Sequence, residues 1–465
     1  MSAVSESAVS ESAVSESAVS ESAVSESAVS ESAVSESAVS ESAVSESAVS
    51  ESAVSESGDS DAVTSDSSET QRPSIKYRKL LPRIETTHDA LILRPAPFSE
   101  PQVEEIPIPS MLPGSVLLRI LATPLHSYSK LGFDFYNPKR SPHEQPFIPG
   151  SSAIARVSRV GDDATALRIG QLVFFDSVMK GRDSPETIRF CNPVYHGFDP
   201  QKMEVIDSSG FADGSYAEFM RAPLENCYPL DEAKLTGHPR EWGFAYTPAQ
   251  LCALATFLRP FGGLSSIDVK PGETVLISPA TYPNGVAACM VALAMGAKVV
   301  ACCHDDAKLV QLNQILSHTH NGSCERITTI TWTGNGTKDV RNINACGPMD
   351  AFLDISPPGA QGSLHLRTGI MSLRPGGRVS LMGAYDELEI PNLFVTRCNI
   401  TLKGNWMHER KDVLALIKMV EHGNLRLNEE DGCYVVGEFG LDQWKEALEA
   451  ANKLTGIGES VVFSF

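Results

Sequence analysis

The feature that most constrains the fold is a change of pattern near residue 240. Beyond that point, short apolar β runs alternate with longer segments of helical periodicity. The first succession runs from Thr274-Val-Leu-Ile through a helix over Ala287–Met295 to Lys298-Val-Val-Ala-Cys-Cys. A β–α–β succession of this kind is typical of a parallel, doubly wound sheet. The sequence therefore predicts an α/β fold with a parallel, doubly wound sheet in its second half.

The preceding region, from about residue 75 to about residue 230, has a different pattern. Short β runs are separated there by Pro and Gly, as at Ser115-Val-Leu-Leu-Arg-Ile-Leu, Ala153-Ile-Ala-Arg-Val and Leu172-Val-Phe-Phe. This spacing predicts a β-rich, barrel-like unit. Near the C-terminus, an amphipathic helix after Phe439 and a strand at Ser460-Val-Val-Phe are expected to close the fold.

Residues 1–71 are predicted to be disordered. From Ser2 to Glu56 the unit Ser-Ala-Val-Ser-Glu recurs eleven times without variation. It provides neither an apolar helical stripe nor large alternating side chains, so burial cannot offset the entropy of ordering. We expect either a neutral expanded tract or a solubilising tail whose serines can be phosphorylated.

The net charge of −20 comes largely from this repeat region. Residues 1–71 hold 15 acidic residues and no basic residue, which leaves −5 for the remainder. No basic patch for a phosphate backbone and no polybasic membrane anchor is found. A nucleic-acid or membrane partner is therefore not expected.

Cysteine usage predicts a reducing compartment. The ten cysteines form no C-x-x-C pair and no closely spaced quartet of the kind that closes a structural zinc site. The N-terminal residues cannot act as a signal h-region, and no apolar run reaches about 18 residues. A cytoplasmic location is expected.

The junction Ile277-Ser-Pro-Ala-Thr-Tyr-Pro-Asn-Gly-Val-Ala-Ala follows one predicted strand and opens a helix. Backbone N–H groups at such a helix start can bind a phosphate, usually where several glycines allow close approach. Only Gly285 is present here, while Tyr282 and Pro283 occupy places where a tight glycine turn is expected. An ordinary strand–turn–helix corner remains the alternative.

The next strand ends Ala301-Cys302-Cys303-His304. An acid at the tip of this strand would bind the ribose hydroxyls of NAD, and none is present. His304 and Lys308 could instead face the 2′-phosphate of NADP, so NADP is favoured over NAD. Asp305 and Asp306 lie close enough to keep NAD open, and His304 could simply be an exposed loop histidine.

Residues 80–465 resemble the medium-chain dehydrogenase/reductase family, which includes zinc-free quinone reductases and alcohol dehydrogenases. The resemblance is carried, in order, by Pro146-Phe-Ile-Pro-Gly150, Val160-Gly, Gly170-Gln-Leu-Val, Gly214-Ser-Tyr-Ala-Glu-Phe219, Val269-Lys-Pro-Gly-Glu-Thr-Val-Leu, Gly296-Ala-Lys-Val-Val, Leu373-Arg-Pro-Gly-Gly-Arg-Val and Gly383. It implies a GroES-like β-barrel catalytic domain over 75–235, a Rossmann nucleotide-binding domain over 236–400, and a segment over 401–465 that returns to the catalytic domain. A homodimer is a further expectation from the family.

The resemblance also allows the catalytic zinc ligands to be compared by position. The first ligand position appears as His126 and the third as Cys252, but the second is Ser151, followed by Ser152 in place of an acid. The four-cysteine structural lobe is missing, with only Cys191 in its place. Two ligands of three make a poor catalytic site, so no metal is expected, and His126 and Cys252 are interpreted as residues that line the pocket or pack.

Without zinc, another group must supply a proton or stabilise charge on the substrate. By position in the family, Tyr128, Tyr136 and Ser151 are the candidate catalytic residues, with a water held by Ser127 or Ser151 as a variant. Both tyrosines could instead simply pack. The candidate cofactor-binding residues are Thr256 and Gly383 beside the nicotinamide, Ala280, Gly285 and Val286 at the pyrophosphate loop, and His304 and Lys308 at the adenosine ribose.

These observations predict an NADPH-dependent, zinc-independent oxidoreductase that transfers hydride to an enone, a quinone or a ketone, or that oxidises the corresponding alcohol. A role in secondary metabolism is an analogy only. The alternatives are a zinc-dependent alcohol dehydrogenase that recruits a third ligand, and a non-catalytic nucleotide-binding or interaction protein of the same fold.

Overall fold

The computed structural model describes residues 86–94, 100–125, 146–182, 188–190, 210–321, 325–357, 360, 362–383, 387–454 and 456–465. The repeat over 1–71 lies outside these ranges, as do His126, Ser127, Tyr128, Tyr136 and Cys191. The described residues all belong to one compact unit that spans Leu81–Phe465. None of the helices in the described ranges is long and apolar enough to cross a membrane.

One sheet has seven strands in the order β16-β17-β3-β4-β5-β9, and β8 also pairs with β3. It combines strands from the first half of the chain with β16 and β17 from the C-terminal segment. The strands are β3 (Ser115–Leu125), β4 (Ala153–Val160), β5 (Leu172–Phe175), β8 (Phe219–Pro223), β9 (Cys227–Pro229), β16 (Tyr434–Phe439) and β17 (Glu459–Ser464). The C-terminal strand β17 runs antiparallel to β3, with Val461 opposite Leu125 and Ser464 opposite Ala122. The predicted β-rich unit and its closing strand are both present.

Smaller elements surround this sheet. Two short antiparallel pairs are β1 (Thr87–Ile92) with β2 (Gln102–Pro107), and β6 (Val178–Lys180) with β7 (Ile188–Phe190). The helices are α3 (Glu232–Leu235), α4 (Pro248–Leu251) and α12 (Trp444–Asn452). The apolar side chains Ala447, Leu448 and Ala451 of α12 are buried together with Val461 and Phe463 of β17, which fixes the C-terminal segment on the sheet.

The second half contains a six-stranded parallel sheet of order β12-β11-β10-β13-β14-β15. Its strands are β10 (Thr274–Ser278), β11 (Lys298–Cys303), β12 (Ile327–Thr331), β13 (Met349–Asp354), β14 (Leu373–Leu381) and β15 (Thr401–Gly404). Its helices are α5 (Ala253–Ser266), α6 (Pro283–Ala294), α7 (Asp306–His318), α8 (Gly336–Asn344), α9 (His365–Met371), α10 (Asn392–Arg397) and α11 (Arg410–Glu421). This confirms the predicted Rossmann-type fold, while the domain limits given above stay predictions.

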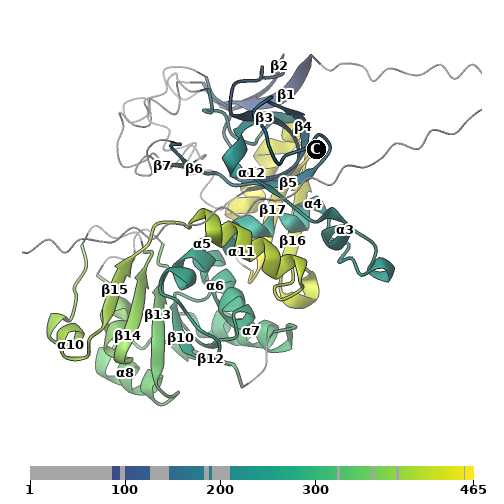
Figure 1. Ribbon diagram of the computed structural model, residues 1–465. Coiled ribbons are helices and arrows are strands. Elements are labelled where there is room, and N and C mark those ends of the chain that lie inside the picture. The colour runs from purple at the N-terminus through teal and green to yellow at the C-terminus, as the bar shows by residue number, and fades with distance from the viewer. Residues whose placement is uncertain are drawn as a thin grey trace, which may run out of the picture. The chain divides into compact units, whose positions relative to one another are not determined.

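Helices cover both faces of this sheet, as α6 and α8 show in Figure 1. Val275 and Ile277 of β10 are buried in the core formed with α5, α6, α7 and α11. Leu276, which points to the opposite face, is buried in the core formed with α8 and α9. Burial on both faces explains why the strands read as continuous apolar runs rather than as alternating patterns.

The strand order reverses between β10 and β13, because the chain first builds outward through β11 and β12 and then returns to the other side of β10. In open α/β sheets, ligands bind in the crevice at the carboxyl ends of the strands on either side of such a reversal. The fold therefore places its candidate site beyond Ser278 and Asp354, the last residues of β10 and β13.

A substitution of Phe352, in the centre of β13, tests how much the core between the parallel sheet and helices α8 and α9 contributes to stability. Its side chain is fully buried, and the α9 helix approaches so closely at Gly369 that a Cβ there would lie 2.4 Å from the Phe352 ring. We expect Phe352→Ala to lower the free energy of unfolding by about 3–5 kcal/mol. Leu393→Ala on α10, where the side chain is 64% exposed, should stay within about 0.5 kcal/mol. Urea unfolding measures both, and an equal effect of the two variants would contradict the assigned core.

Candidate active site

Two cavities meet at the carboxyl edge of the parallel sheet. The first cavity, of about 380 Å³, lies beside the junction of β10 and α6 and beyond the end of β11. The second cavity, of about 300 Å³, is lined by residues of the barrel sheet, of α5 and of the segment after β15. They are contiguous because six residues line both: Tyr282, Pro283, Ser356, Pro357, Leu454 and Glu459.

The loop between β10 and α6 presents a helix start to the first cavity. Tyr282 is the N-cap residue of α6 and makes no side-chain capping hydrogen bond, and Pro283 is the first helical residue. The initial N–H groups of a helix have no partner within the helix and carry the positive end of its dipole. Pro at this position costs little because its missing N–H would have been one of these unpaired groups. The helix start can therefore accept a phosphate despite the loss of the usual glycines.

Gly285 has a packing role that the sequence did not reveal. A Cβ at this position would lie 2.0 Å from the carbonyl oxygen of Pro279 and 2.9 Å from Ala280. Only glycine therefore allows α6 to approach the preceding loop this closely. Ala280 and Val286 are buried within the same packing and line neither cavity. Contact of these three residues with a pyrophosphate stays a prediction.

His304 and Lys308 both line the first cavity, as does Asp305. The acids that follow β11 already have local hydrogen-bond partners. The Asp305 carboxylate accepts from the backbone N–H of Lys308 at 3.0 Å and caps α7, while Asp306 accepts from the Thr331 hydroxyl at 2.6 Å. The lining of the cavity therefore includes one lysine, the imidazoles of His304 and His365, and the carboxylates of Asp305 and Glu459, of which Asp305 is engaged as a helix cap.

A buried polar network at the end of β13 was not predicted. The Ser356 hydroxyl donates to Asp354 Oδ1 at 2.7 Å and lies 2.9 Å from His365 Nε2, and His365 Nδ1 lies 2.7 Å from the Ser363 hydroxyl. Across the first cavity, the Trp332 indole donates to the Ser278 hydroxyl at 3.0 Å. These contacts hold Ser356 rigidly where the two cavities join.

Of the three positions compared with zinc ligands, the structure describes the second, Ser151, and the third, Cys252. Ser151 is buried, and Ser152, which lines the second cavity, donates to the Ser177 hydroxyl at 3.1 Å and accepts from its backbone N–H at 3.1 Å. Cys252 also lines this cavity, and burial raises the pKa of its thiol far above the ordinary value. Within the described ranges, no group of three His, Cys, Asp or Glu side chains is placed to hold a metal ion, and His126, at the first ligand position, lies outside those ranges.

Thr256 and Gly383, predicted to flank the nicotinamide, are brought together by the fold. Thr256 lies on α5 and Gly383 follows β14, and both line the second cavity together with Met382. The two residues therefore share one cavity. Their contact with a nicotinamide stays a prediction. Tyr128 and Tyr136 cannot be placed because they lie outside the described residues.

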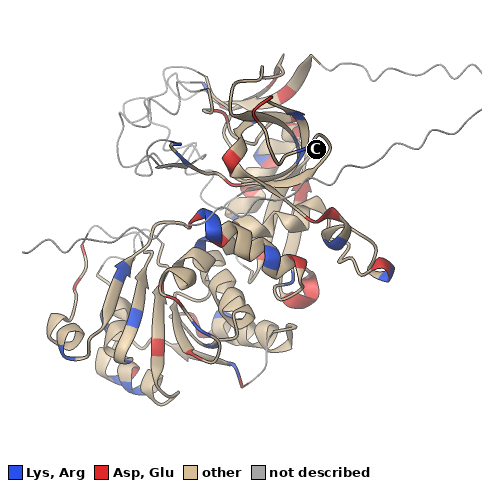
Figure 2. Cartoon of the chain, viewed as in Figure 1, with Lys and Arg blue, Asp and Glu red and all other residues tan. Residues whose placement is uncertain are grey.

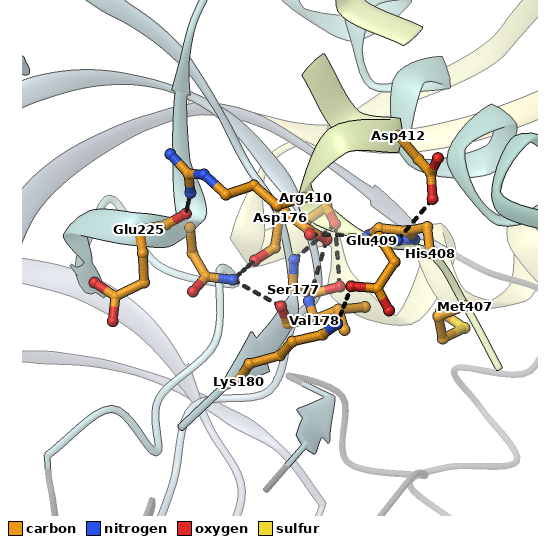
Figure 3. Close-up of polar contacts among 12 residues, drawn as sticks. Asp176, Ser177, Val178, Lys180, Glu225, Met407, His408, Glu409, Arg410 and Asp412 are labelled. Carbon is orange, nitrogen blue, oxygen red and sulfur yellow. Dashed lines mark hydrogen bonds and ion pairs between the residues drawn. The ribbon is translucent and has the colours of Figure 1, made fainter. Parts of the chain in front are cut away.

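The second cavity contains an ion-pair geometry that the sequence reasoning missed. His408 Nε2 lies 2.9 Å from Asp176 Oδ2, and both side chains are about 5% exposed. Asp176 follows β5 and His408 follows β15, so the pair joins the two halves of the fold (Figure 3). The two residues are 232 positions apart, and nothing local in the sequence pairs them. The only available signal was that Asp176 directly follows a predicted buried strand.

Comparisons with known proteins agree with this architecture. Residues 113–232 match the alcohol dehydrogenase GroES-like domain. The chain contains that domain. Acryloyl-coenzyme A reductase of Sulfurisphaera tokodaii is 22% identical over 374 residues, which cover 80% of this chain and 98% of the relative. L-threonine 3-dehydrogenase of Pyrococcus abyssi is 24% identical over 377 residues, with 77% and 94% covered.

Among solved structures, a thermostable alcohol dehydrogenase from Pyrobaculum aerophilum superposes with a TM-score of 0.57 at 18% identity, covering 82% of this chain and all of the other. This likeness shows a shared fold. Together with the GroES-like domain and the two relatives, it confirms the predicted resemblance to the medium-chain dehydrogenase/reductase family. The predicted enzyme class, an NAD(P)-dependent oxidoreductase of that type, is confirmed as well.

Gly285 provides a test of the nucleotide loop. We expect Gly285→Ala to weaken binding of a nicotinamide nucleotide, because the added methyl group pushes α6 away from the Pro279 carbonyl, and to cost about 1–3 kcal/mol of stability. Gly404→Ala is the matched control, since a Cβ there meets nothing within 4 Å. Fluorescence titration with NADPH measures the first effect and thermal unfolding the second. Unchanged binding by Gly285→Ala would show that the loop does not contact the nucleotide.

Proposed function

We propose that this chain is an NADPH-dependent, zinc-independent oxidoreductase that reduces a ketone, an enone or a quinone, or oxidises the corresponding alcohol. One observation carries the proposal: two contiguous cavities meet at the reversal of strand order, one beside a helix start and the other lined by buried polar groups. The first is the nucleotide cavity of the proposal and the second is its substrate cavity.

The first cavity fits a dinucleotide. The unpaired N–H groups at the start of α6 would bind the pyrophosphate, and Lys308 would bind the adenosine ribose or its phosphate. Thr256 and Gly383 would hold the nicotinamide at the second cavity, which the six shared residues connect to the first. When bound, the nicotinamide supplies the hydride. The contribution of this chain is to hold the reacting carbons close together in a dry cavity.

Three features support NADPH over NADH. β11 ends at Cys303 without an acid, Lys308 lines the cavity, and the nearest carboxylates, Asp305 and Asp306, are engaged with the Lys308 backbone N–H and with Thr331. An acid that bound a ribose diol would need both oxygens directed at the sugar. A lysine beside the ribose favours a phosphate there.

The substrate class follows from what the second cavity can do. It contains the hydroxyl groups of Ser152 and Ser177 and the Asp176–His408 pair, all of which suit a carbonyl or alcohol oxygen. The relatives are named for reduction of acryloyl-coenzyme A and for dehydrogenation of L-threonine. These names support both an activated double bond and a carbonyl–alcohol pair as the reacting group.

The charge and thiol distribution suits a small-molecule enzyme in a reducing compartment. Basic and acidic residues are interspersed along the described elements (Figure 2), unlike the single-sign surfaces that bind nucleic acid. All eight cysteines in the described ranges are free, as in cytosolic proteins. A cytoplasmic location is therefore part of the proposal.

The first experiment measures NADPH and NADH binding by the full chain, zinc content on the same sample, and NADPH oxidation with phenanthrenequinone, cinnamaldehyde and acetophenone. We expect NADPH binding without bound zinc, and turnover that a chelator does not change. Cys252→Ser should keep most of the turnover because the thiol serves packing. Loss of activity on chelation would instead support a zinc-dependent alcohol dehydrogenase, and failure to bind either nucleotide would support a non-catalytic protein.

Lys308 tests the nucleotide preference. We expect Lys308→Ala to weaken NADPH binding on the order of tenfold, since a hydrogen bond between charged groups is worth roughly 1.5–3 kcal/mol, and to leave NADH binding nearly unchanged. Lys298→Ala is the control, because Lys298 is an exposed lysine at the start of β11, the end of that strand away from the first cavity. Parallel titrations with the two nucleotides measure the ratio. An equal loss for both would mean that Lys308 does not contact the 2′-phosphate.

A further inference from the structure

We propose that His408 is the acid–base residue of this enzyme, giving a proton to the carbonyl oxygen of the substrate through Nδ1 while Asp176 positions its ring. This inference rests on the proposed function, which leaves open the group that replaces a metal at the substrate oxygen. It places that group on the segment after β15, far in sequence from the tyrosines suggested by resemblance.

The two nitrogens of His408 have different environments. Nε2 lies 2.9 Å from Asp176 Oδ2, whereas Nδ1 is buried and has no hydrogen-bond partner among the described residues. A buried polar atom left unpaired destabilises the fold, so its persistence calls for an explanation. His408 lines the second cavity, and a substrate oxygen bound there would supply the missing partner.

Asp176 is held in place independently of His408. Its Oδ1 accepts from the backbone N–H of Val178 at 3.1 Å, and its backbone carbonyl accepts from the side-chain amide of Asn226 at 2.8 Å. The second oxygen is thereby directed at the imidazole (Figure 3). A carboxylate that accepts from Nε2–H fixes the tautomer in which Nδ1 is free to take and release a proton.

The turn that carries His408 is also constrained. Met407 has a left-handed φ of +62°, and its carbonyl accepts from the Asn405 side chain at 2.9 Å. A Cβ at Gly262 of α5 would lie 2.7 Å from His408 Cβ, so glycine is required for this approach. A left-handed φ at a residue other than glycine costs on the order of 1 kcal/mol or more. Such a residue persists where its surroundings impose the conformation.

The helix start that follows the turn provides a further anchor. Glu409 is the N-cap of α11, and its backbone N–H donates to Asp412 Oδ2 at 2.8 Å, while Asp412 Oδ1 accepts from the Ser265 hydroxyl at 2.7 Å. Lys180 pairs with Glu409 at 2.6 Å from the barrel side. His408 is therefore positioned by both halves of the fold, as a group that acts on a substrate between them must be.

The proposed step adds one hydride and one proton to the substrate. During reduction, the substrate carbon receives the hydride, the electron pair of the C=O bond moves to oxygen, and that oxygen takes the proton from Nδ1 of the His408 imidazolium. His408 is left neutral with its Nε2–H still donated to Asp176, and solvent returns the proton before the next turnover. In alcohol oxidation the same proton moves from the hydroxyl to Nδ1. The substrate class implied is therefore a carbonyl–alcohol pair.

Other titratable groups surround the pair. Arg259, Glu459 and Cys252 line the same cavity, and Arg410, next to Glu409 on α11, lies over the Tyr228 ring at 4.9 Å. Burial, and then the nearby Asp176, raise the pKa of Tyr228. A pH profile of the wild-type protein alone could not separate these groups, so the test compares variants that remove only the imidazole or only the carboxylate charge.

The test uses the full chain with NADPH and acetophenone, cinnamaldehyde or phenanthrenequinone. We expect His408→Gln to lower kcat by about 10²–10⁴-fold and to abolish the fall of kcat with rising pH that marks loss of the imidazolium proton. Asp176→Asn should lower kcat on the order of tenfold. Both variants should bind NADPH as the wild type does. His422→Gln, at the other end of α11 and exposed, is the matched control and should change neither rate nor profile.

Unchanged kcat and an unchanged pH profile in His408→Gln would overturn the assignment while leaving the oxidoreductase intact. Failure of the wild type to bind NADPH would instead overturn the proposed function, and this inference with it. If NADPH binds but none of the three probes is reduced, ¹⁵N-histidine spectra decide, with the His408 signals assigned from His408→Gln. An Nδ1 that is seen to gain and lose a proton supports the proposal, and one that does not overturns it.

Discussion

The antiparallel pairing of β17 with β3 determines how the rest of the molecule is arranged. It joins the last residues of the chain to the longest strand of the barrel sheet, so the chain must leave the parallel sheet after β15 and cross back. That crossing brings Leu454 and Glu459 to the rim that both cavities share. It also carries His408 across to Asp176. The site is therefore a product of the connection between the two sheets, and neither sheet forms it alone.

Most of the fold could be predicted from the sequence because strands buried on both faces leave a local signature. Val275, Leu276 and Ile277 alternate between two cores, and each is apolar for that reason. The change from short strands to a β–α–β rhythm is equally local. The cavity positions of Thr256 and Gly383 followed from resemblance, because order and spacing along the chain survive substitution of the ligands themselves.

The polar groups of the site could not be predicted in the same way. Hydrogen bonds such as Asp176–His408 and Ser356–His365 join residues whose pairing depends on the tertiary fold, and each partner alone looks like an ordinary polar residue in a loop. Gly285 illustrates a different limit. A glycine in a phosphate loop can serve the ligand or the packing, and only the 2.0 Å approach to the Pro279 carbonyl shows that packing already requires it. A motif therefore identifies the position without identifying the physical reason.

Three departures from local rules lie at the cavities. Tyr282 begins α6 without a capping side chain, Met407 is left-handed, and His408 keeps a buried nitrogen without a partner among the described residues. The starts of α7, α8 and α4 are capped by the side chains of Asp305, Asn335 and Thr247, whereas α10 and α12, like α6, begin without a side-chain cap. A folded chain tolerates an unsatisfied group where something outside the chain completes it. The uncapped start of α6 calls for an anion and the free imidazole nitrogen for an oxygen, and a dinucleotide with a carbonyl substrate would supply both at once.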